Sequence, residues 1–242
     1  MVKKHLKKNT YLYHLEELRL VLISIIIFFV VSFVFSMFFI EKIMMFLQDP
    51  IKTIGVKLNY FKPEEKFLTY LKVGFFAGIF LSLPFALFRL GYFIYPALKK
   101  NEKKYFYLII FILPLIFYSG CFFAYKIIFP VAIQFFYNFA GATSLNPIWG
   151  ISSYFDLLIA LIFATGVVFL LPLPLVFLIR SNIISVQLIN KSRPYIIIII
   201  LILAAIFSPP DVVSQLLVAI PLYLLFELSV LAGKLIKRGE QK

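Results

Sequence analysis

The sequence is poor in the side chains that catalytic and metal sites use. Its 242 residues include one cysteine, two histidines and 11 acidic residues. The lone Cys121 excludes an intrachain disulfide and a cysteine-based metal site. Both histidines precede the first long apolar run, and neither a GxxxxGK[ST] loop nor an HExxH motif occurs. We therefore expect no enzyme activity, no metal and no cofactor.

Charged residues are also scarce. They make up 14% of the chain, whereas hydrophobic residues make up 62%, and a soluble domain carries roughly 25% charged residues. Several uninterrupted apolar runs reach the roughly 20 residues that a helix needs to cross a bilayer. The first run, Leu20–Ile40, is too long for the core of a signal peptide, and no small-residue cleavage site follows it. The composition predicts an all-α polytopic membrane protein.

The apolar runs predict six transmembrane helices in a single integral membrane domain, residues 1–242. The predicted spans are Leu20–Ile40, Leu71–Tyr92, Tyr105–Tyr125, Tyr154–Ile179, Tyr195–Phe207 and Val212–Leu231. Sixteen lysines and arginines fall on the side of the two termini, and six fall on the other side. Because positive charges stay on the cytoplasmic side, both termini are expected to be cytoplasmic.

The two longer outer loops differ in charge. The loop Glu41–Lys66 mixes both signs and is broken by Pro50, Gly55 and Pro63, so we expect short helices on the membrane surface. Pro50 is assigned a structural role there. The second loop, Lys126–Ser153, carries almost no charge.

The fifth and sixth spans are predicted to be short. Tyr195–Phe207 has 13 residues, about 20 Å of helix at 1.5 Å per residue, against a hydrocarbon core of roughly 30 Å. Pro209 and Pro210 end this span, and Asp211 follows them. Either the bilayer thins at this hairpin or its tip lies in a wet recess.

Three polar residues fall at membrane depth in the last span. Asp211 is placed to cap the sixth helix, or alternatively to line a polar recess, and Gln215 lies one turn further on the same face. Glu227 either faces a cavity or partner, as membrane carboxylates usually do, or lies at the interface near Lys234. In the second span, Arg89 either extends to the interface or faces protein.

Acidic residues on the cytoplasmic side are the candidates for recognition. Glu16 and Glu17 precede the first span, in the stretch His14–Arg19, where the alternative is a solvated helix end with a Glu16–Arg19 ion pair. Glu102 stands among four lysines in the next cytoplasmic loop. The alternative there is that the lysines set topology and Glu102 reduces their repulsion.

Several motifs together resemble the TatC family, the multispanning subunits of the twin-arginine protein translocase. The matching residues are His14-Leu15-Glu16-Glu17-Leu18-Arg19; Pro63, Glu65, Phe67 and Leu71-Lys72; Tyr95-Pro96-Ala97-Leu98 with Glu102-Lys103-Lys104; Arg193-Pro194-Tyr195; Ser208-Pro209-Pro210-Asp211-Val212 with Ser214-Gln215; and Ala219-Ile220-Pro221 with Phe226-Glu227. The match runs from His14 to Leu231 and agrees with six spans, the last two short.

This resemblance implies a receptor in the cell (inner) membrane that binds twin-arginine signal peptides of folded cargo proteins. Glu17 and Glu102 match the recognition positions, Leu18 belongs to the same motif, and Arg19 is expected to orient Glu17. The implied partners are TatA-type and TatB-type single-span proteins and further copies of the chain in a larger complex. The implied energy source is the proton-motive force.

Three positions depart from the family pattern. Leu170 stands where many members carry Glu or Gln, so that contact with a partner helix is not expected here. Arg89 stands where a neutral polar residue is common, and Gly91 replaces a usual Trp. The alternative function is a secondary transporter of a small solute or ion, which proline-broken spans and Asp211 fit loosely. The chain shows no internal repeat and no midplane cluster of ionisable residues to support it.

Overall fold

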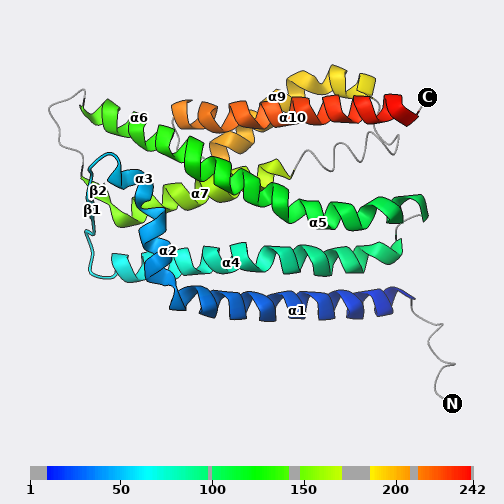
Figure 1. Cartoon of the computed structure of the whole chain (residues 1–242), viewed down its shortest axis with the longest axis horizontal. Coiled ribbons are helices and arrows are strands. Elements are labelled where there is room, and N and C mark those ends of the chain that lie inside the picture. The colour runs from blue at the N-terminus through cyan, green and yellow to red at the C-terminus, as the bar shows by residue number, and fades with distance from the viewer. Residues whose placement is uncertain (1–9, 98–99, 142–147, 171–185, 208–211, 241–242) are drawn as a thin grey trace, which may run out of the picture. The chain divides into compact units, whose positions relative to one another are not determined.

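The computed structural model describes residues 10–97, 100–141, 148–170, 186–207 and 212–240, and Figure 1 labels its elements. The helices of this part are α1 (Thr10–Phe38), α2 (Ile40–Leu47), α3 (Asp49–Lys52), α4 (Glu65–Ile94), α5 (Lys100–Phe123), α6 (Phe129–Gly141), α7 (Ile151–Phe169), α9 (Val186–Phe207) and α10 (Val212–Glu240), with a 3₁₀ turn at Tyr95–Ala97 and a π turn at Ala124–Ile128. The strands β1 (Leu58–Asn59) and β2 (Trp149–Gly150) pair in parallel. The all-α fold class is confirmed.

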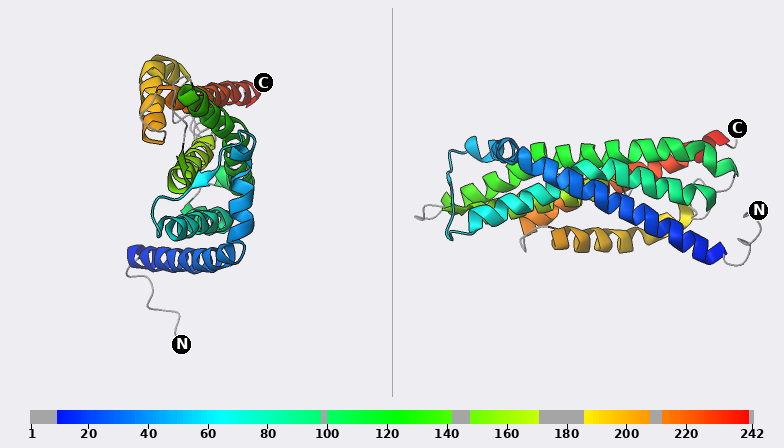
Figure 2. Two further views of the ribbon diagram at one scale, coloured as in Figure 1. Left: turned by 90° about the vertical axis from the view of Figure 1, so that its left-hand side faces the viewer. Right: turned by 90° about the horizontal axis from the view of Figure 1, so that it is seen from below.

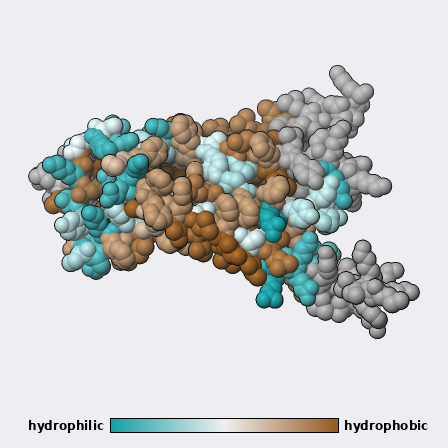
Figure 3. Space-filling view, turned by 60° about the horizontal axis from the view of Figure 1, so that its bottom comes forward, coloured by the Kyte–Doolittle hydropathy of each residue, from teal (hydrophilic) through white to brown (hydrophobic). Residues whose placement is uncertain are grey.

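Five helical segments of this part are long and apolar enough to cross a membrane. They are His14–Phe38, Glu65–Ile94, Ile110–Asn138, Ile151–Phe169 and Gln187–Ala205, and a shorter apolar segment covers Gln215–Leu231. On the face drawn in Figure 3, hydrophobic side chains gather along the middle of the helices and hydrophilic ones lie toward the helix ends. Such a surface suits hydrocarbon around the helices and water at their ends.

The chain divides into two compact units. The first contains Met1–Ile43 and Tyr70–Pro114, and the second contains Met44–Thr69 and Leu115–Lys242. In the first unit, α1 and α4 run antiparallel side by side (Figure 1, Figure 2).

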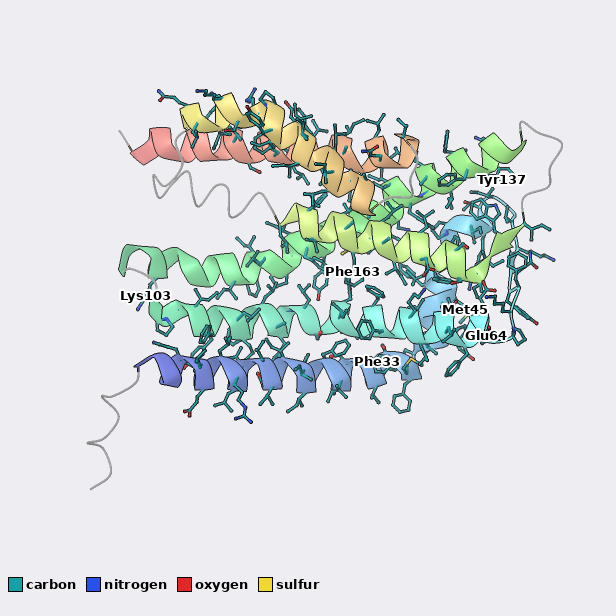
Figure 4. The ribbon with its side chains drawn as sticks, turned by 180° about the vertical axis from the view of Figure 1, so that it is seen from behind. Phe33, Met45, Glu64, Lys103, Tyr137 and Phe163 are labelled. Carbon is teal, nitrogen blue, oxygen red and sulfur yellow. The ribbon has the colours of Figure 1, made fainter. Side chains whose placement is uncertain are left out.

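Two glycines let α1 and α4 approach closely. Gly74 and Gly78 are spaced as a GxxxG motif, which brings helices together in membranes. A Cβ at Gly78 would lie 2.9 Å from the Cα of Phe33 on α1. The hydroxyl of Ser36 donates to the carbonyl of Gly74 at 2.7 Å. Phe33 is labelled on α1 in Figure 4. At this level the α1–α4 contact is therefore made by small residues and the hydrogen bond from Ser36 to Gly74.

The second unit packs the later part of α5 against α7. Phe117, Phe155, Leu158 and Leu161 are fully buried in its core. Gly166 on α7 makes room for the ring of Phe117, because a Cβ there would lie 2.8 Å from that ring. Aromatic and aliphatic packing of this kind holds helices together where polar groups are absent.

The predicted loop Lys126–Ser153 is wrong in its first half, because the chain stays helical through Gly141. The π turn at Ala124–Ile128 joins α5 to α6, and the N–H of Phe129 bonds to the carbonyl of Ala124. Pro130 follows directly at the second position of α6, where its missing N–H costs little. The π turn thus resets the hydrogen-bond register at the proline, and the helix continues.

The last two helices also extend beyond the predicted spans. The predicted span Tyr195–Phe207 is the C-terminal part of α9, which begins at Val186 and carries Pro194 inside it. The predicted span Val212–Leu231 continues in α10 as far as Glu240. The apolar run marks only the part of each helix that suits hydrocarbon. The helix itself extends into the polar flanks.

Short helices follow α1, as predicted for the loop Glu41–Lys66. Pro50 lies in the first turn of α3 and is buried. The last carbonyls of α2 lack intrahelical partners, as at any helix end. The hydroxyls of two tyrosines donate to them: Tyr125 to Phe46 at 2.6 Å and Tyr154 to Leu47 at 2.8 Å. The end of α2 is thus tied to the core of the second unit.

Candidate functional site

Glu17 precedes Ser24 and Phe28, which contact α4, by seven and eleven residues, a spacing that places it on the same face of α1. Its side chain is 27% exposed, whereas Glu16 and Arg19 are exposed. His14 lies one turn earlier, with its Nδ1 3.7 Å from a Glu17 carboxylate oxygen. Among the described residues, Glu17 therefore contacts His14, and the Glu16–Arg19 ion pair of the alternative interpretation is not formed. Leu18 is half-buried beside them.

The register of α1 against α4 fixes the level of Glu17. The rings of Phe28 and Phe85 stack at 4.3 Å, and the Nε of Arg89 donates to the hydroxyl of Ser24 at 2.9 Å. Because the helices are antiparallel, a residue four positions earlier on α1 lies level with a residue four positions later on α4. Glu17 is seven residues before Ser24, so it lies level with the position seven residues after Arg89. That position is in the 3₁₀ turn that follows α4.

The second predicted acid follows that turn. Glu102 lies in the first turn of α5, and its side chain lies outside the described residues. Next to it, the ammonium of Lys103 lies over the ring of Tyr95, 4.9 Å from the ring centroid, at the end of this unit where α4 passes into α5 (Figure 4). A carboxylate in the first turn of a helix is stabilised by the helix dipole. The backbone positions of Glu17 and Glu102 therefore lie toward the same end of the first unit.

Arg89 faces protein, one of the two positions predicted for it. Its side chain is half-buried between α4 and α1. The hydroxyl of Ser24, which accepts its Nε–H, itself donates to the carbonyl of Val21 at 2.7 Å. A guanidinium carries five N–H donors, so this bond occupies one of them. The hydrogen bond holds the guanidinium of Arg89 against α1, about two helical turns from Glu17.

A second polar network joins α9 to α10 in the other unit. A terminal nitrogen of Arg193 lies 3.0 Å from one carboxylate oxygen of Glu227, and the hydroxyl of Tyr223 donates to the other oxygen at 3.0 Å. Glu227 therefore faces a partner, the arginine of the neighbouring helix, which is one of the positions predicted for it. Toward the other end of the pair, the amide of Gln215 donates to the carbonyl of Leu201 at 3.0 Å.

The predicted sites Pro209, Pro210 and Asp211 lie outside the described residues. Within the described part of the chain, no group of three or more histidine, cysteine or acidic side chains is arranged to hold a metal ion. Thr165 on α7 is buried, and its hydroxyl has no hydrogen-bond partner among the described residues.

Sequence reasoning missed the structural role of Glu65, which it named only within a motif. One carboxylate oxygen of Glu65 accepts from the N–H groups of Phe61 and Lys62, at 2.7 and 3.3 Å. The other accepts from the N–H of Ser152 at 3.1 Å, in the first turn of α7. Gly150 lies against this bridge, since a Cβ there would meet the Phe61 ring at 3.0 Å. The bond to Lys62, three residues earlier, is the glutamate half of a capping box, but Lys62 stands where that motif has Ser or Thr, so the sequence signal is incomplete.

These features define the class of the protein. Long apolar helices and helix contacts made by small residues are those of a multi-pass α-helical membrane protein. Residues 13–221 match the family model of the Sec-independent protein translocase protein, TatC. The chain belongs to the TatC family.

Individual relatives agree with the family model. The chain is 34% identical over 235 residues to the TatC protein of Carboxydothermus hydrogenoformans, covering 97% of this chain and 96% of the relative. It is 31% identical over 242 residues to the TatCy protein of Bacillus subtilis, covering 100% and 95%. A crystal structure of the twin arginine translocase receptor TatC superposes with a TM-score of 0.81 at 32% identity, over 91% of this chain and 99% of that one.

Proposed function

We propose that this chain is the signal-peptide receptor of a twin-arginine translocase, with Glu17 and Glu102 binding the paired arginines of the signal peptide. The observation that carries the proposal is the placement of Glu17. Its half-buried carboxylate lies level with the turn from which α5 begins, and Glu102 follows in the first turn of that helix. The description of the matching crystal structures as a twin arginine translocase receptor supports the same function.

The chemistry of the ligand explains why acids are needed here. A guanidinium pairs with a carboxylate through two parallel hydrogen bonds, in a geometry that lysine cannot reproduce. The chain carries 24 basic and 11 acidic residues, so a basic peptide finds few acceptors on the side predicted to be cytoplasmic. Leu18 contributes apolar contact, and Arg19 orients Glu17 from the exposed side of the helix.

The remaining parts of the proposal concern assembly and energy. The receptor works with TatA-type and TatB-type single-span proteins, in several copies within a larger complex, and export draws on the proton-motive force. Both termini are cytoplasmic, and six helices cross the cell (inner) membrane. Asp211, Gln215 and Glu227 are the polar membrane positions of the last span. The chain binds and organises partners and catalyses no reaction.

The test is photocross-linking of the full-length protein in membranes to a signal peptide with two arginines. Glu17→Gln and Glu102→Gln should each reduce cross-linking and export by at least about tenfold, since charge-assisted hydrogen bonds contribute roughly 1.5–3 kcal/mol. Glu16→Gln is the matched control, because it removes the same charge from the exposed neighbour. Unchanged cross-linking in both Glu17→Gln and Glu102→Gln would show that these acids do not bind the arginines.

A further inference from the structure

The last part of α4 and the first part of α5 are in close contact at one position. Gly91 of α4 is buried, and Ile110 of α5 fills the space that a side chain at position 91 would take. A Cβ on Gly91 would overlap the Cδ1 of Ile110 and would lie 2.8 Å from its Cγ1. Gly91 therefore lets the two helices approach more closely than a larger residue would.

The contact leaves Ile110 little freedom to move aside. Isoleucine is branched at Cβ, and in a helix its χ1 torsion has one strongly preferred rotamer. Its Cγ1 is therefore held in place, and only Cδ1 can turn away from α4. A side chain at position 91 meets Cγ1 as well, so it moves the first part of α5 away from α4.

This contact lies between the two acids of the proposed receptor site. Glu17 is tied to α4 through α1, by the hydrogen bond from Arg89. Gly91 follows Arg89 by two residues, and Ile110 follows Glu102 by eight, about 12 Å of helix rise. Two helix contacts therefore link the acids. One joins α1 to α4 at Arg89, and the other joins α4 to α5 at Gly91.

We propose that Gly91 is a positioning residue of the receptor site. Its contact with Ile110 sets the separation of Glu17 from Glu102, so that both arginines of one signal peptide bind at once. This role rests on the proposed function, in which the two acids bind the paired arginines. Neighbouring arginines are joined by a short length of chain, so the second one binds in the same complex only when the acids stand at a matching distance. A wider separation leaves one arginine unbound.

The experiment measures the affinity of the full-length protein in nanodiscs for three fluorescent signal peptides, which carry Arg-Arg, Arg-Gln or Gln-Arg. The unchanged protein should bind the two-arginine peptide at least about tenfold more tightly than either single-arginine peptide, the factor that one charge-assisted hydrogen bond supplies. Gly91→Leu should reduce this preference to less than about threefold, because the second arginine no longer reaches its acid. Gly91→Ala, the smaller change, should reduce it partly.

The single-arginine peptides separate spacing from damage to the fold. Each of them needs one acid only, so their affinities should stay the same in Gly91→Leu. Gly91→Leu with Ile110→Ala gives the leucine the space that the isoleucine occupied, and it should recover the preference for two arginines.

The matched control overpacks the second unit instead. Gly166→Ala places a Cβ 2.6 Å from the sulfur of Cys121, so it should lower the unfolding temperature. It lies outside the helices that carry the two acids, and it should keep the full preference for two arginines.

Three results would overturn the proposal. A full preference for two arginines in both Gly91→Leu and Gly91→Ala would show that the contact does not set the spacing. An equal loss of all three peptides would assign Gly91 a role in folding alone. A double variant with Ile110→Ala that is as stable as the unchanged protein, yet lacks the preference, would separate the preference from the contact. If the unchanged protein itself shows no preference for two arginines, the proposed function fails, and not only the role of Gly91.

Discussion

Arg89 on α4 is bound to Ser24 on α1, with its Nε 2.9 Å from the serine hydroxyl. The bond lies within the helix pair that also contains the stacked rings of Phe28 and Phe85. An arginine at the centre of a bilayer costs roughly 2.5–3.5 kcal/mol on insertion scales. The serine offsets part of that cost, because it accepts one N–H inside the contact between the two helices. The charge-assisted hydrogen bond from Arg89 to Ser24 therefore joins α4 to α1.

The first prediction concerns this bond. Ser24→Ala removes the acceptor and leaves the Nε–H of Arg89 without its partner on α1, so the protein should lose about 1.5–3 kcal/mol of stability. Thermal unfolding of the purified protein in detergent measures the loss. Ser119→Ala is the matched control, since Ser119 is exposed and its hydroxyl donates only within its own helix, to Ile116. In an Arg89→Met background, Ser24→Ala should cost much less; an equal loss in both backgrounds would contradict the coupling.

The second prediction concerns the pair Arg193–Glu227. Glu227→Gln leaves Arg193 without a countercharge and should destabilise the protein by about 1–3 kcal/mol, less than a fully buried pair because both side chains are partly exposed. The exchange Arg193→Glu with Glu227→Arg should recover part of the loss. Asp49→Asn is the control, since the Asp49–Lys52 pair is more than half exposed and should contribute less than about 1 kcal/mol. A double exchange less stable than either single variant would argue against direct pairing.

The third prediction concerns the capping role of Glu65. Glu65→Ala removes the acceptor for three N–H groups, in the loop before α4 and at the start of α7. The expected result is a lower unfolding temperature in detergent, since the three N–H groups then lack their acceptor. Glu65→Gln keeps one acceptor oxygen and should lose less. Glu64→Ala removes the exposed neighbouring acid and should stay within about 0.5 kcal/mol. If Glu64→Ala and Glu65→Ala lose the same stability, the bridge to Ser152 does not contribute.

Hydropathy predicted where helices lie more reliably than where they end. The first two predicted spans fall within α1 with α2 and within α4. The third predicted span ends at Tyr125, before the predicted loop Lys126–Ser153, yet the π turn carries the helix past Lys126 and Pro130. Likewise Pro194 lies inside α9. A helix can continue past a proline when a shift of hydrogen-bond register or a neighbouring helix compensates for the lost N–H. A single sequence does not show whether that compensation is present.

The residue types of the candidate site came from the sequence, and only some of its contacts did. The scarcity of acids on a basic side of the chain pointed to Glu16, Glu17 and Glu102, and the resemblance to the TatC family selected Glu17 and Glu102. The partners of Arg89 and Glu227 could not be predicted, since both bonds join residues more than 30 positions apart. Such contacts depend on how helices pack, which the order of residues along one helix does not determine.

The last prediction separates two glycines that share one helix face. A Cβ at Gly78 would lie 2.9 Å from the backbone Cα of Phe33, so Gly78→Ala must push α1 away and should cost more than about 1 kcal/mol, the usual range for forced overpacking. A Cβ at Gly74 would instead meet the sulfur of Met37, part of a side chain with several rotatable bonds. Gly74→Ala should therefore cost less, and its helix propensity offsets part of the loss. Thermal unfolding of both variants, and of the double variant Gly74→Ala with Met37→Ala, measures the difference. If Gly74→Ala is the more damaging change and Met37→Ala does not relieve it, the close contact of α1 with α4 is not limited by the Phe33 backbone.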